Sequence, residues 1–172
     1  AIRAGIGLVT EDRKQSGCFL PLSIRLNTVM AALPQHCKGP FVHQKKTGES
    51  AAAIKETLAV KAPSTETIIS NLSGGNQQKV LIGRWLLTEP EILIFDEPTR
   101  GIDVGSKAEI HRMISDLAKQ GKCIIMVSSE LPEVMGMSDR ILVMHEGELT
   151  GFVDRKDFSQ ETIMRYATGI VD

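Results

Sequence analysis

Residues 71–103 read NLSGGNQQKVLIGRWLLTEPEILIFDEPTRGID, and this stretch decides the fold. A polar turn with paired glycines opens a segment of helical length, which Pro90 ends. Four apolar residues, 92–95, then lead directly into Asp96 and Glu97. A run that is apolar at every position is typical of a central parallel strand covered on both faces. We therefore expect a helix, then a buried strand, with two acids at the carboxyl end of that strand.

The glycine turn consists of Ser73, Gly74 and Gly75. Ser73 is predicted to be the N-cap of the helix, with its hydroxyl accepting a hydrogen bond from a free backbone N–H. Glycines let the backbone approach an anion closely, and the start of a helix presents N–H groups and the positive end of its dipole. The turn therefore favours a phosphate ligand, although a glycine turn that only caps a helix would look the same.

Asp96 and Glu97 form the second candidate site. An acid that ends an all-apolar strand is in position to hold Mg²⁺, directly or through water. The neighbouring acid can orient or deprotonate an attacking water. Pro98 blocks continuation of the strand, so we expect both side chains to face a loop. Adjacent acids also occur in solvated turns, and the pair alone does not separate the two interpretations.

The flanking segments predict an α/β fold. Residues 5–10 are expected to form a buried strand. Four charged residues follow it, Glu11, Asp12, Arg13 and Lys14, at the strand end where α/β proteins place ligands. A solvated loop is the alternative for these charges. Asp103 is expected to cap a helix that runs to about residue 120, and residues 122–128 read as a further buried strand. This alternation of strands and helices indicates a parallel sheet.

The rest of the chain adds helices and a hairpin. Residues from about 11 to 71 are expected to be mainly helical without a convincing strand. Two helices, 21–33 ended by Pro34 and 49–60, would flank a mobile loop. Two further strands, 141–144 and 149–153, would surround a tight turn before a short helix over 160–166.

The expected loop, residues 35–47, carries two groups of polar side chains. A metal site can be imagined from His36, Cys37 and His43, but they lack a second Cys/His pair at zinc-site spacing, so a solvated loop is expected. The Lys45–Lys46 pair is expected to be a solvated patch.

Composition narrows the class of protein. The chain has 172 residues, 42% hydrophobic and 24% charged, which suits one soluble domain with a real core. Its net charge of −1 gives no overall indication of nucleic acid or anionic lipid. Three widely spaced cysteines fit reduced thiols better than disulfides. The chain starts with Ala1 rather than Met, and a strand follows almost at once, so we expect part of a longer protein.

The joint occurrence of LSGGNQQKV and ILIFDEPTRGID at close spacing resembles the ATP-binding cassette (ABC) ATPases. By that resemblance residues 72–77 are the signature sequence and residues 92–96 the Walker B strand. Glu97 is similar to the catalytic glutamate of the family, and residues 101–103 to its D-loop. The resemblance covers essentially the whole chain.

A closer resemblance is carried by LVTEDR, SGGNQQKV, DEPTRGIDVG and VSSELPEV. Together they look like the second cassette of the fused, two-cassette ATPase subunits of bacterial monosaccharide importers. This implies a P-loop NTPase-like parallel sheet with a mainly helical subdomain over about 11–72. The remainder, 1–10 and 73–172, would hold the signature helix and the α/β core, and residues 1–172 as a whole would be a partial domain.

The chain departs from the family pattern at three places. No GxxxxGK[ST] phosphate loop occurs in the sequence, so a cassette without its first part is expected. Glu11 stands where most relatives have the Q-loop glutamine. Ser129 stands where most have the switch histidine, as it does in the sugar-importer second cassettes, and a serine cannot carry a positive charge near neutral pH.

The resemblance implies ATP hydrolysis between two cassettes. The signature turn, through Ser73, Gly74, Gly75, Asn76 and Gln77, would close over the γ-phosphate of an ATP held by the other cassette. Mg²⁺ would lie near Asp96 and water near Glu97, with further roles for Ser129, Asp103 and Glu11. The implied partners are a second cassette, a membrane permease and, indirectly, a periplasmic sugar-binding protein, at the cytoplasmic face of the inner membrane.

Two alternatives stay open. A non-transport ABC ATPase acting on nucleic acid is disfavoured by the balanced charge and by the lack of a basic stripe or coiled-coil insertion. A non-catalytic cassette that only completes the site of a partner is disfavoured by the intact Glu97 but favoured by the missing phosphate loop.

Overall fold

The computed structural model describes residues 1–170. The chain divides into two compact units, Ala1–Val127 and the part from Ser128 onward, and each unit is described by itself.

A three-stranded parallel sheet lies at the centre of the first unit. Its strands are β1 (Ile6–Val9), β4 (Ile92–Asp96) and β5 (Cys123–Val127), in the order β1-β4-β5. Leu8, Ile94 and Ile125 are in register across the three strands. The predicted parallel sheet and the α/β class are therefore confirmed, and β4 is its central strand.

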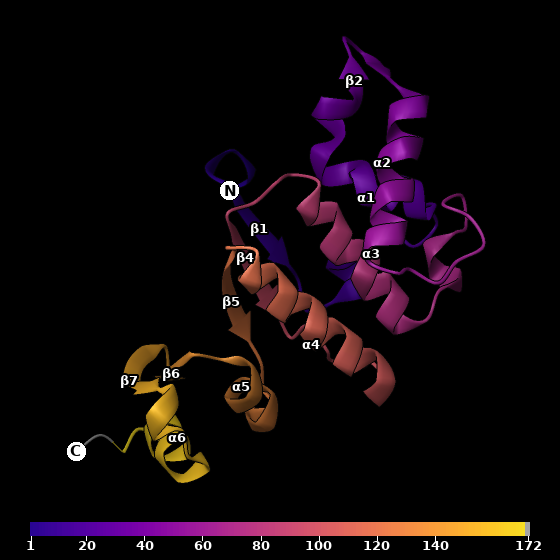
Figure 1. Cartoon of the computed structure of the whole chain (residues 1–172). Helices are drawn as coiled ribbons and strands as arrows, with labels where there is room; N and C mark the ends of the chain where they lie inside the picture. The colour runs from indigo at the N-terminus through magenta and orange to yellow at the C-terminus, as the bar shows by residue number, and fades with distance from the viewer. Residues whose placement is uncertain (171–172) are drawn as a thin grey trace. The chain divides into compact units, whose positions relative to one another are not determined.

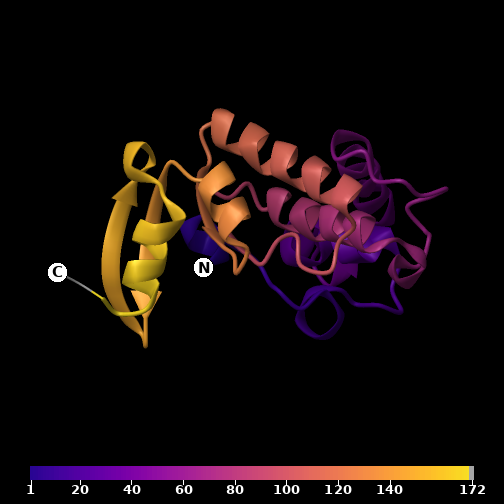
Figure 2. The same cartoon turned by 90° about the horizontal axis from the view of Figure 1, so that it is seen from below.

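Helices α3 (Gly74–Leu86) and α4 (Val104–Lys119) lie side by side and pack against β1 and β5 respectively (Figures 1 and 2). Close packing on β1 depends on Gly7, because a methyl group there would lie 3.3 Å from Cβ of Trp85. Leu93 and Phe95 of β4 are fully buried. One part of the core thus lies between one face of the sheet and these two helices, and another part lies in the helical segment, where Ile24, Val29 and Ile69 are buried.

The other face of the sheet is only partly covered. Leu8, Ile125 and Val127 remain 41%, 49% and 50% exposed, and Ile94 is half-buried. The prediction that residues 122–128 form a buried strand is therefore wrong for alternate residues. β4, predicted to be covered on both faces, is half-buried on this face. The apolar runs do predict the strands, but they do not tell which side chains the described helices reach.

A helical part connects β1 to α3. It contains α1 (Ile24–Val29), a 3₁₀ segment η3 (Met30–His36), the short strands β2 (Cys37–Lys38) and β3 (Phe41–Val42), and α2 (Gln44–Thr57). Shorter turns are η1 (Ile2–Ala4), the π-turn η2 (Arg13–Gly17) and η4 (Ile69–Asn71).

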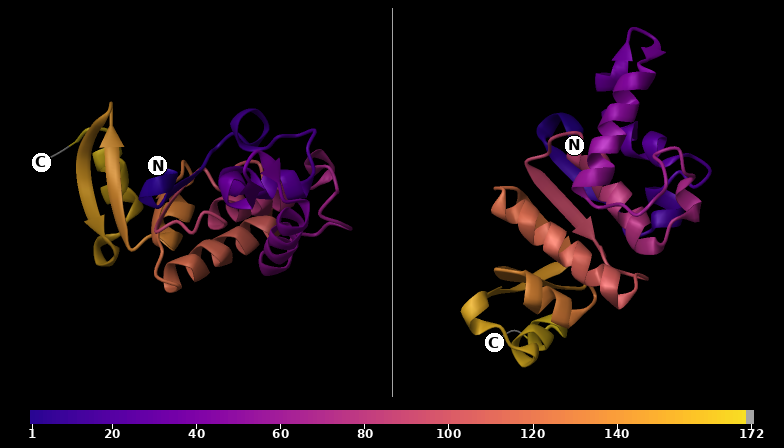
Figure 3. Two further views of the ribbon diagram at one scale, coloured as in Figure 1. Left: turned by 90° about the horizontal axis from the view of Figure 1, so that it is seen from above. Right: turned by 45° about the vertical axis from the view of Figure 1, so that its right-hand side comes forward.

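Three expectations for this part are wrong. Pro34 does not end the helix, because the chain tightens into η3 and carries the proline inside it. Residues 35–47 are not a mobile loop: they form the β2–β3 hairpin and the first turn of α2 (Figure 3). α2 begins at Gln44, five residues before its expected start, because the side chain of His43 caps it by accepting from the Lys46 N–H at 3.3 Å.

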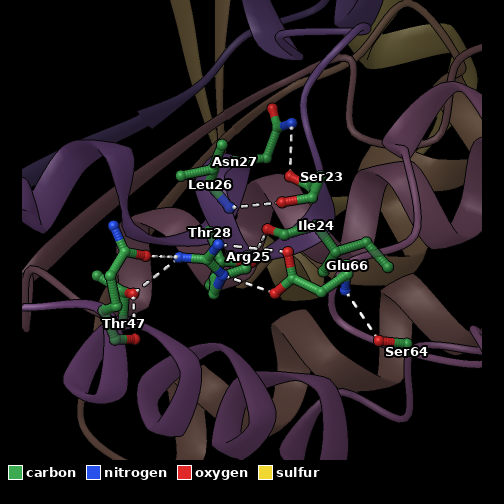
Figure 4. Close-up of polar contacts among 10 residues, drawn as sticks. Ser23, Ile24, Arg25, Leu26, Asn27, Thr28, Thr47, Ser64 and Glu66 are labelled. Atoms are coloured by element: carbon green, nitrogen blue, oxygen red, sulfur yellow. Dashed lines mark hydrogen bonds and ion pairs between the residues drawn. The ribbon is translucent and has the colours of Figure 1, made fainter.

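Arg25 joins three segments of the helical part (Figure 4). Its guanidinium donates to Glu66 at 2.6 Å, to Gln44 at 2.7 Å and to Thr47 at 3.1 Å. Thr47 is fully buried, and Ser23 caps α1 by accepting from the Leu26 N–H. Such a fork of donors fixes α1 against α2 and against the segment that leads to α3.

The second unit is a hairpin covered by helices. Strands β6 (Arg140–His145) and β7 (Glu148–Asp154) pair antiparallel, and α6 (Gln160–Ala167) packs on them (Figure 2). The unit also contains α5 (Leu131–Met137) and η5 (Arg155–Asp157). Its core is formed by Ile141, Val143, Val153 and Ile163. The hairpin and the final helix are as predicted.

No helix within residues 1–170 is long and apolar enough to cross a membrane.

Candidate functional site

The glycine turn begins α3, but Ser73 does not cap the helix with its side chain. Its hydroxyl instead accepts a hydrogen bond from the amide of Asn76 at 2.9 Å. The predicted cap bond is therefore wrong: the Ser73 oxygen meets the side-chain amide of Asn76 and no backbone N–H of α3. As a result the first backbone N–H groups of α3 are not used by Ser73, which suits the anion site expected at this helix start.

Asn76 and Gln77 hold the turn in shape. The side-chain amide oxygen of Asn76 accepts a hydrogen bond from the backbone N–H of Lys61 at 2.8 Å. Gln77 is buried, and its amide donates to the carbonyls of Ile69 and Leu72, both at 3.2 Å. These bonds give both side chains a role in the fold, and their contact with a nucleotide stays a prediction.

The two glycines let the start of α3 approach the loop after β4. A methyl group on Gly75 would lie 2.5 Å from Cβ and Oγ of Ser106, inside any allowed contact. A methyl group on Gly74 would lie 3.5 Å from the carbonyl oxygen of Gly101. The glycine turn and the start of α4, which lie some thirty residues apart in the sequence, are therefore in direct contact.

Asp96 is the last residue of β4, and Glu97 follows in a left-handed conformation with φ of 47°. Its N–H donates to the Val127 carbonyl at 2.9 Å, and its carbonyl accepts from the Arg100 N–H at 3.2 Å. A left-handed non-glycine residue costs on the order of 1 kcal/mol or more, and such residues gather at functional sites. Glu146 shares the same φ in a plain hairpin turn, so the angle supports a functional role for Glu97 without deciding it.

Asp103 caps α4 as predicted. Its carboxylate accepts from the Ser106 N–H at 3.0 Å. This backbone hydrogen bond is the main reason that the pKa of Asp103 lies below its usual range. Asp103 is therefore a fixed negative charge beside the glycine turn.

Two arginines connect the loops: Arg13, which the sequence reasoning included among the charges after the first strand, and Arg100, which it did not single out. Arg13 donates to the carbonyls of Arg100 and Gly101, at 2.8 and 3.3 Å. Arg100 in turn pairs with Glu11. The available signal was the position of the two arginines after neighbouring parallel strands, whose ends meet at one edge of the sheet. Since the Arg100–Glu11 pair is exposed, it contributes to loop position more than to stability.

A third arginine, which belongs to α3 itself, connects this helix to α1 and to the end of η2. Arg84 is buried and donates to Asn27 and Gly17, with its closest bonds at 2.7 and 2.6 Å. Asn27 is itself fully buried and donates to three backbone carbonyls around the start of α1. Burial lowers the pKa of Arg84. Helices α3 and α1 are therefore joined by one buried polar network, which the sequence pattern did not reveal.

The donor set fits Mg²⁺ bound together with a nucleotide. Within residues 1–170 no group of three or more His, Cys, Asp or Glu side chains is placed so that it could hold a metal ion. Asp96 and Glu97 supply two carboxylates. Protein Mg²⁺ sites commonly use one or two carboxylates, with the other ligands coming from phosphate oxygens and water. The acids therefore suit a nucleotide-bound cation and not a metal held by protein alone.

Ser129 belongs to the second unit and is exposed. The neighbouring Ser128 hydroxyl donates to the buried Glu133 and accepts from the Glu130 N–H at 3.0 Å. Ser128 thus shapes the start of α5, which the sequence reasoning missed. A catalytic role for Ser129 stays a prediction.

A groove of about 680 Å³ lies in the first unit between α2, α3 and α4. Its walls include Leu58, Lys79, Glu109 and Leu117, and none of the predicted site residues lines it. The candidate site is therefore not this hollow but the loop edge of the sheet, where Glu11 and Asp103 lie.

Residues 2–100 match the family model described as ABC transporter, and the chain belongs to this family.

The most similar curated relatives include ribose/galactose/methyl galactoside import ATP-binding proteins. The one from Geobacillus kaustophilus is 55% identical over 98% of the chain and 34% of its own length. The one from Ralstonia nicotianae is 57% identical over 98% of the chain and 33% of its own length. The chain thus spans about a third of the length of the curated relatives it matches.

Solved structures agree on the fold. A dimeric ATP-binding cassette in a post-hydrolysis state with ADP and Pi aligns with a TM-score of 0.71 at 23% sequence identity. The alignment covers 89% of the present chain and 64% of the length of that cassette. A metal-chelate type ABC transporter in an inward-facing conformation aligns with a TM-score of 0.78 at 17% identity, over 95% of the chain and 64% of its own. The predicted P-loop NTPase-like fold, present in part, is confirmed.

Proposed function

We propose that the chain is part of the second cassette of an ATPase subunit that powers monosaccharide import across the bacterial inner membrane. The observation that carries the proposal is the contact of the glycine turn with the start of α4, where Gly75 meets Ser106. Asp96 ends β4 and Glu97 follows it, so both acids stand at the beginning of the segment that leads to α4. The names of relatives at 55–57% identity support a sugar as the transported substrate.

The residues divide into two half-sites. Ser73, Gly74 and Gly75 would bind the γ-phosphate of an ATP held by a partner cassette, through the free N–H groups at the start of α3. Asn76 and Gln77 would keep that turn in shape. Asp96 and Glu97 would serve the ATP of their own cassette.

Within its own half-site the chain would act mainly by positioning the reacting groups and stabilising charge, without forming a covalent intermediate. Asp96 would hold Mg²⁺, which when bound supplies positive charge to the phosphate oxygens. Glu97 would accept a proton from the attacking water. Glu11 would take the Q-loop position, tied through Arg100 to the loop that also bears Asp103. Ser129 would donate or accept a hydrogen bond at the switch position without adding a charge.

We infer that the 172 residues alone bind ATP poorly and do not hydrolyse it. They contain no GxxxxGK[ST] motif, whose backbone and lysine hold the β- and γ-phosphates. The mainly helical region around residues 21–33, within the helical subdomain of about 11–72, would face the permease. Micromolar affinity for MgATP together with turnover by the isolated chain would contradict this inference.

The assigned partners and place are those of an importer. A second cassette completes the ATP sites, the permease carries the sugar, and a periplasmic sugar-binding protein acts indirectly. The subunit would lie at the cytoplasmic face of the inner membrane, held there by the permease.

Reconstitution tests the transport function. The complete subunit, with its permease, is placed in proteoliposomes, and ATP hydrolysis is measured with and without sugar-loaded binding protein. Stimulation by ribose, galactose or another monosaccharide is expected. Hydrolysis that responds to no sugar but to nucleic acid would favour the non-transport alternative.

A further inference from the structure

The β2–β3 hairpin exposes an aromatic side chain at its turn. Every residue from Lys38 to Lys46, here called the hairpin tip, is exposed. Phe41 is 76% exposed, an unusual state for a phenylalanine. Figure 3 shows the hairpin at the end of α2 that lies away from the sheet. The hairpin tip therefore presents Phe41 outward from the first unit.

The base of the hairpin is fixed. The His43 N–H donates to the His36 carbonyl at 2.8 Å. His36 is buried, and its ring nitrogens lie 2.9 Å from the Ala32 carbonyl and 2.9 Å from the Ser50 hydroxyl of α2. The turn itself uses Gly39 with φ of 60°, where an added methyl group would meet open space. Gly39 thus serves the turn geometry, and Phe41 is held in solvent by an ordered scaffold.

The charge around Phe41 is of one sign. Lys38, Lys45 and Lys46 belong to the hairpin tip, which has no acidic residue. The next acid along the chain, Glu49, lies 3.9 Å from Lys45, and both side chains are largely exposed. Lys46 also donates to the Gln35 carbonyl at 2.7 Å, which keeps its charge beside the hairpin. The hairpin tip is therefore locally positive, although the net charge of the whole chain is −1.

We propose that the hairpin tip binds an anionic phospholipid surface, with Phe41 entering the headgroup region and the three lysines contacting lipid phosphates. An aromatic side chain among lysines is typical of interfacial membrane contacts. The exposed apolar side chains of the hairpin tip are Phe41 and, in part, Val42, whereas a stable protein interface takes about 20–30 residues on each partner. The contact requires neither ATP nor the permease, so it does not depend on the proposed transport function.

Vesicle co-sedimentation of the chain tests the proposal. Vesicles of phosphatidylglycerol and phosphatidylcholine in equal parts are compared with phosphatidylcholine alone. Binding is expected only to the anionic vesicles and should weaken steeply between about 50 and 500 mM salt, because screening removes the lysine contribution. Phe41→Ser should reduce binding about tenfold, and each lysine-to-glutamine change at Lys38 or Lys45 about fivefold.

Phe152→Ser is the matched control, because it removes a 59% exposed phenylalanine from the second unit. Its vesicle binding should stay within about twofold of the unsubstituted chain. Equal loss in the two phenylalanine variants, equal binding to neutral vesicles, or no vesicle binding would each overturn the proposal.

A fluorescence measurement gives a second, independent result. Phe41→Trp is made in a Trp85→Phe background, so that the new indole is the only one in the chain. A blue shift on adding anionic vesicles, with quenching by brominated acyl chains, is expected if position 41 enters the interface. Unchanged emission in vesicle-saturated samples would overturn insertion.

Discussion

Replacement of Gly75 by alanine tests the contact that carries the proposed site. The new methyl carbon would lie 2.5 Å from Cβ of Ser106, an atom that cannot move without its backbone. Because carbon atoms need about 3.5 Å or more, α3 and α4 must separate by roughly 1 Å. Overpacking of this kind costs about 1–3 kcal/mol, while alanine returns up to about 1 kcal/mol of helix propensity. We expect a net loss of about 1–2 kcal/mol.

Gly74→Ala is the matched control. Its methyl carbon would lie 3.4 Å from Arg13, at the flexible end of that side chain, so stability should change by less than about 0.5 kcal/mol. Urea unfolding followed by circular dichroism measures both variants. The double variant Gly75→Ala with Ser106→Gly should be more stable than the sum of the single changes, because the clash is gone. Equal stability of the two alanine variants, or additive behaviour of the pair, would refute the packing argument.

Two further predictions concern polar groups of the first unit. Gln78 is buried and its amide has no hydrogen-bonding partner in residues 1–170, so Gln78→Met should be neutral or stabilise by about 1 kcal/mol in urea unfolding. Gln77→Met should destabilise, because it removes two bonds to backbone carbonyls, and the opposite order would contradict this. Glu109 accepts a hydrogen bond from the buried Lys79 at 2.7 Å, which holds its pKa below the ordinary value of 4.5. The contribution of this ion pair to the free energy of unfolding is thus present above pH 4.5 and is lost as pH falls through the folded-state pKa of Glu109. The free energy of unfolding of Glu109→Gln should therefore fall less on acidification than that of the unsubstituted chain. The same pH profile in both proteins would argue against the pairing.

Local sequence signals predicted the elements well. The apolar run before Asp96 predicted β4, and Asp103 predicted the cap of α4. In the second unit, Glu146 and Gly147 both have positive φ, and this turn joins the two predicted strands. Each of these features depends on residues within one or two turns of each other, so a sequence pattern contains the necessary information.

Contacts between distant residues explain the misses. The hairpin around Phe41 is ordered because His36 reaches Ser50, fourteen residues away. Arg13 reaches the carbonyl of Arg100 across two neighbouring strands. No periodicity records such pairings, since each depends on which segments the fold brings together.

The predicted site could be placed only in part. The sequence identified the glycine turn and the loop of Asp103, and the close approach of Gly75 to Ser106 joins them. It did not identify the buried Arg84–Asn27 network that fixes α3, because buried polar residues resemble surface ones in a single sequence. The nucleotide contacts of the individual residues stay predictions.

Glu97→Gln in the complete subunit, with the other cassette silenced by substitution, tests the central proposal most directly. Hydrolysis of radiolabelled ATP and retention of unhydrolysed ATP after gel filtration are measured together. Loss of the general base should lower turnover about a hundredfold or more while ATP stays bound. Glu146→Gln is the control, since it makes the same change at a residue with the same φ of 47° and should leave turnover unaltered. Unchanged turnover in Glu97→Gln would contradict the assignment of Asp96 and Glu97 to the hydrolytic site.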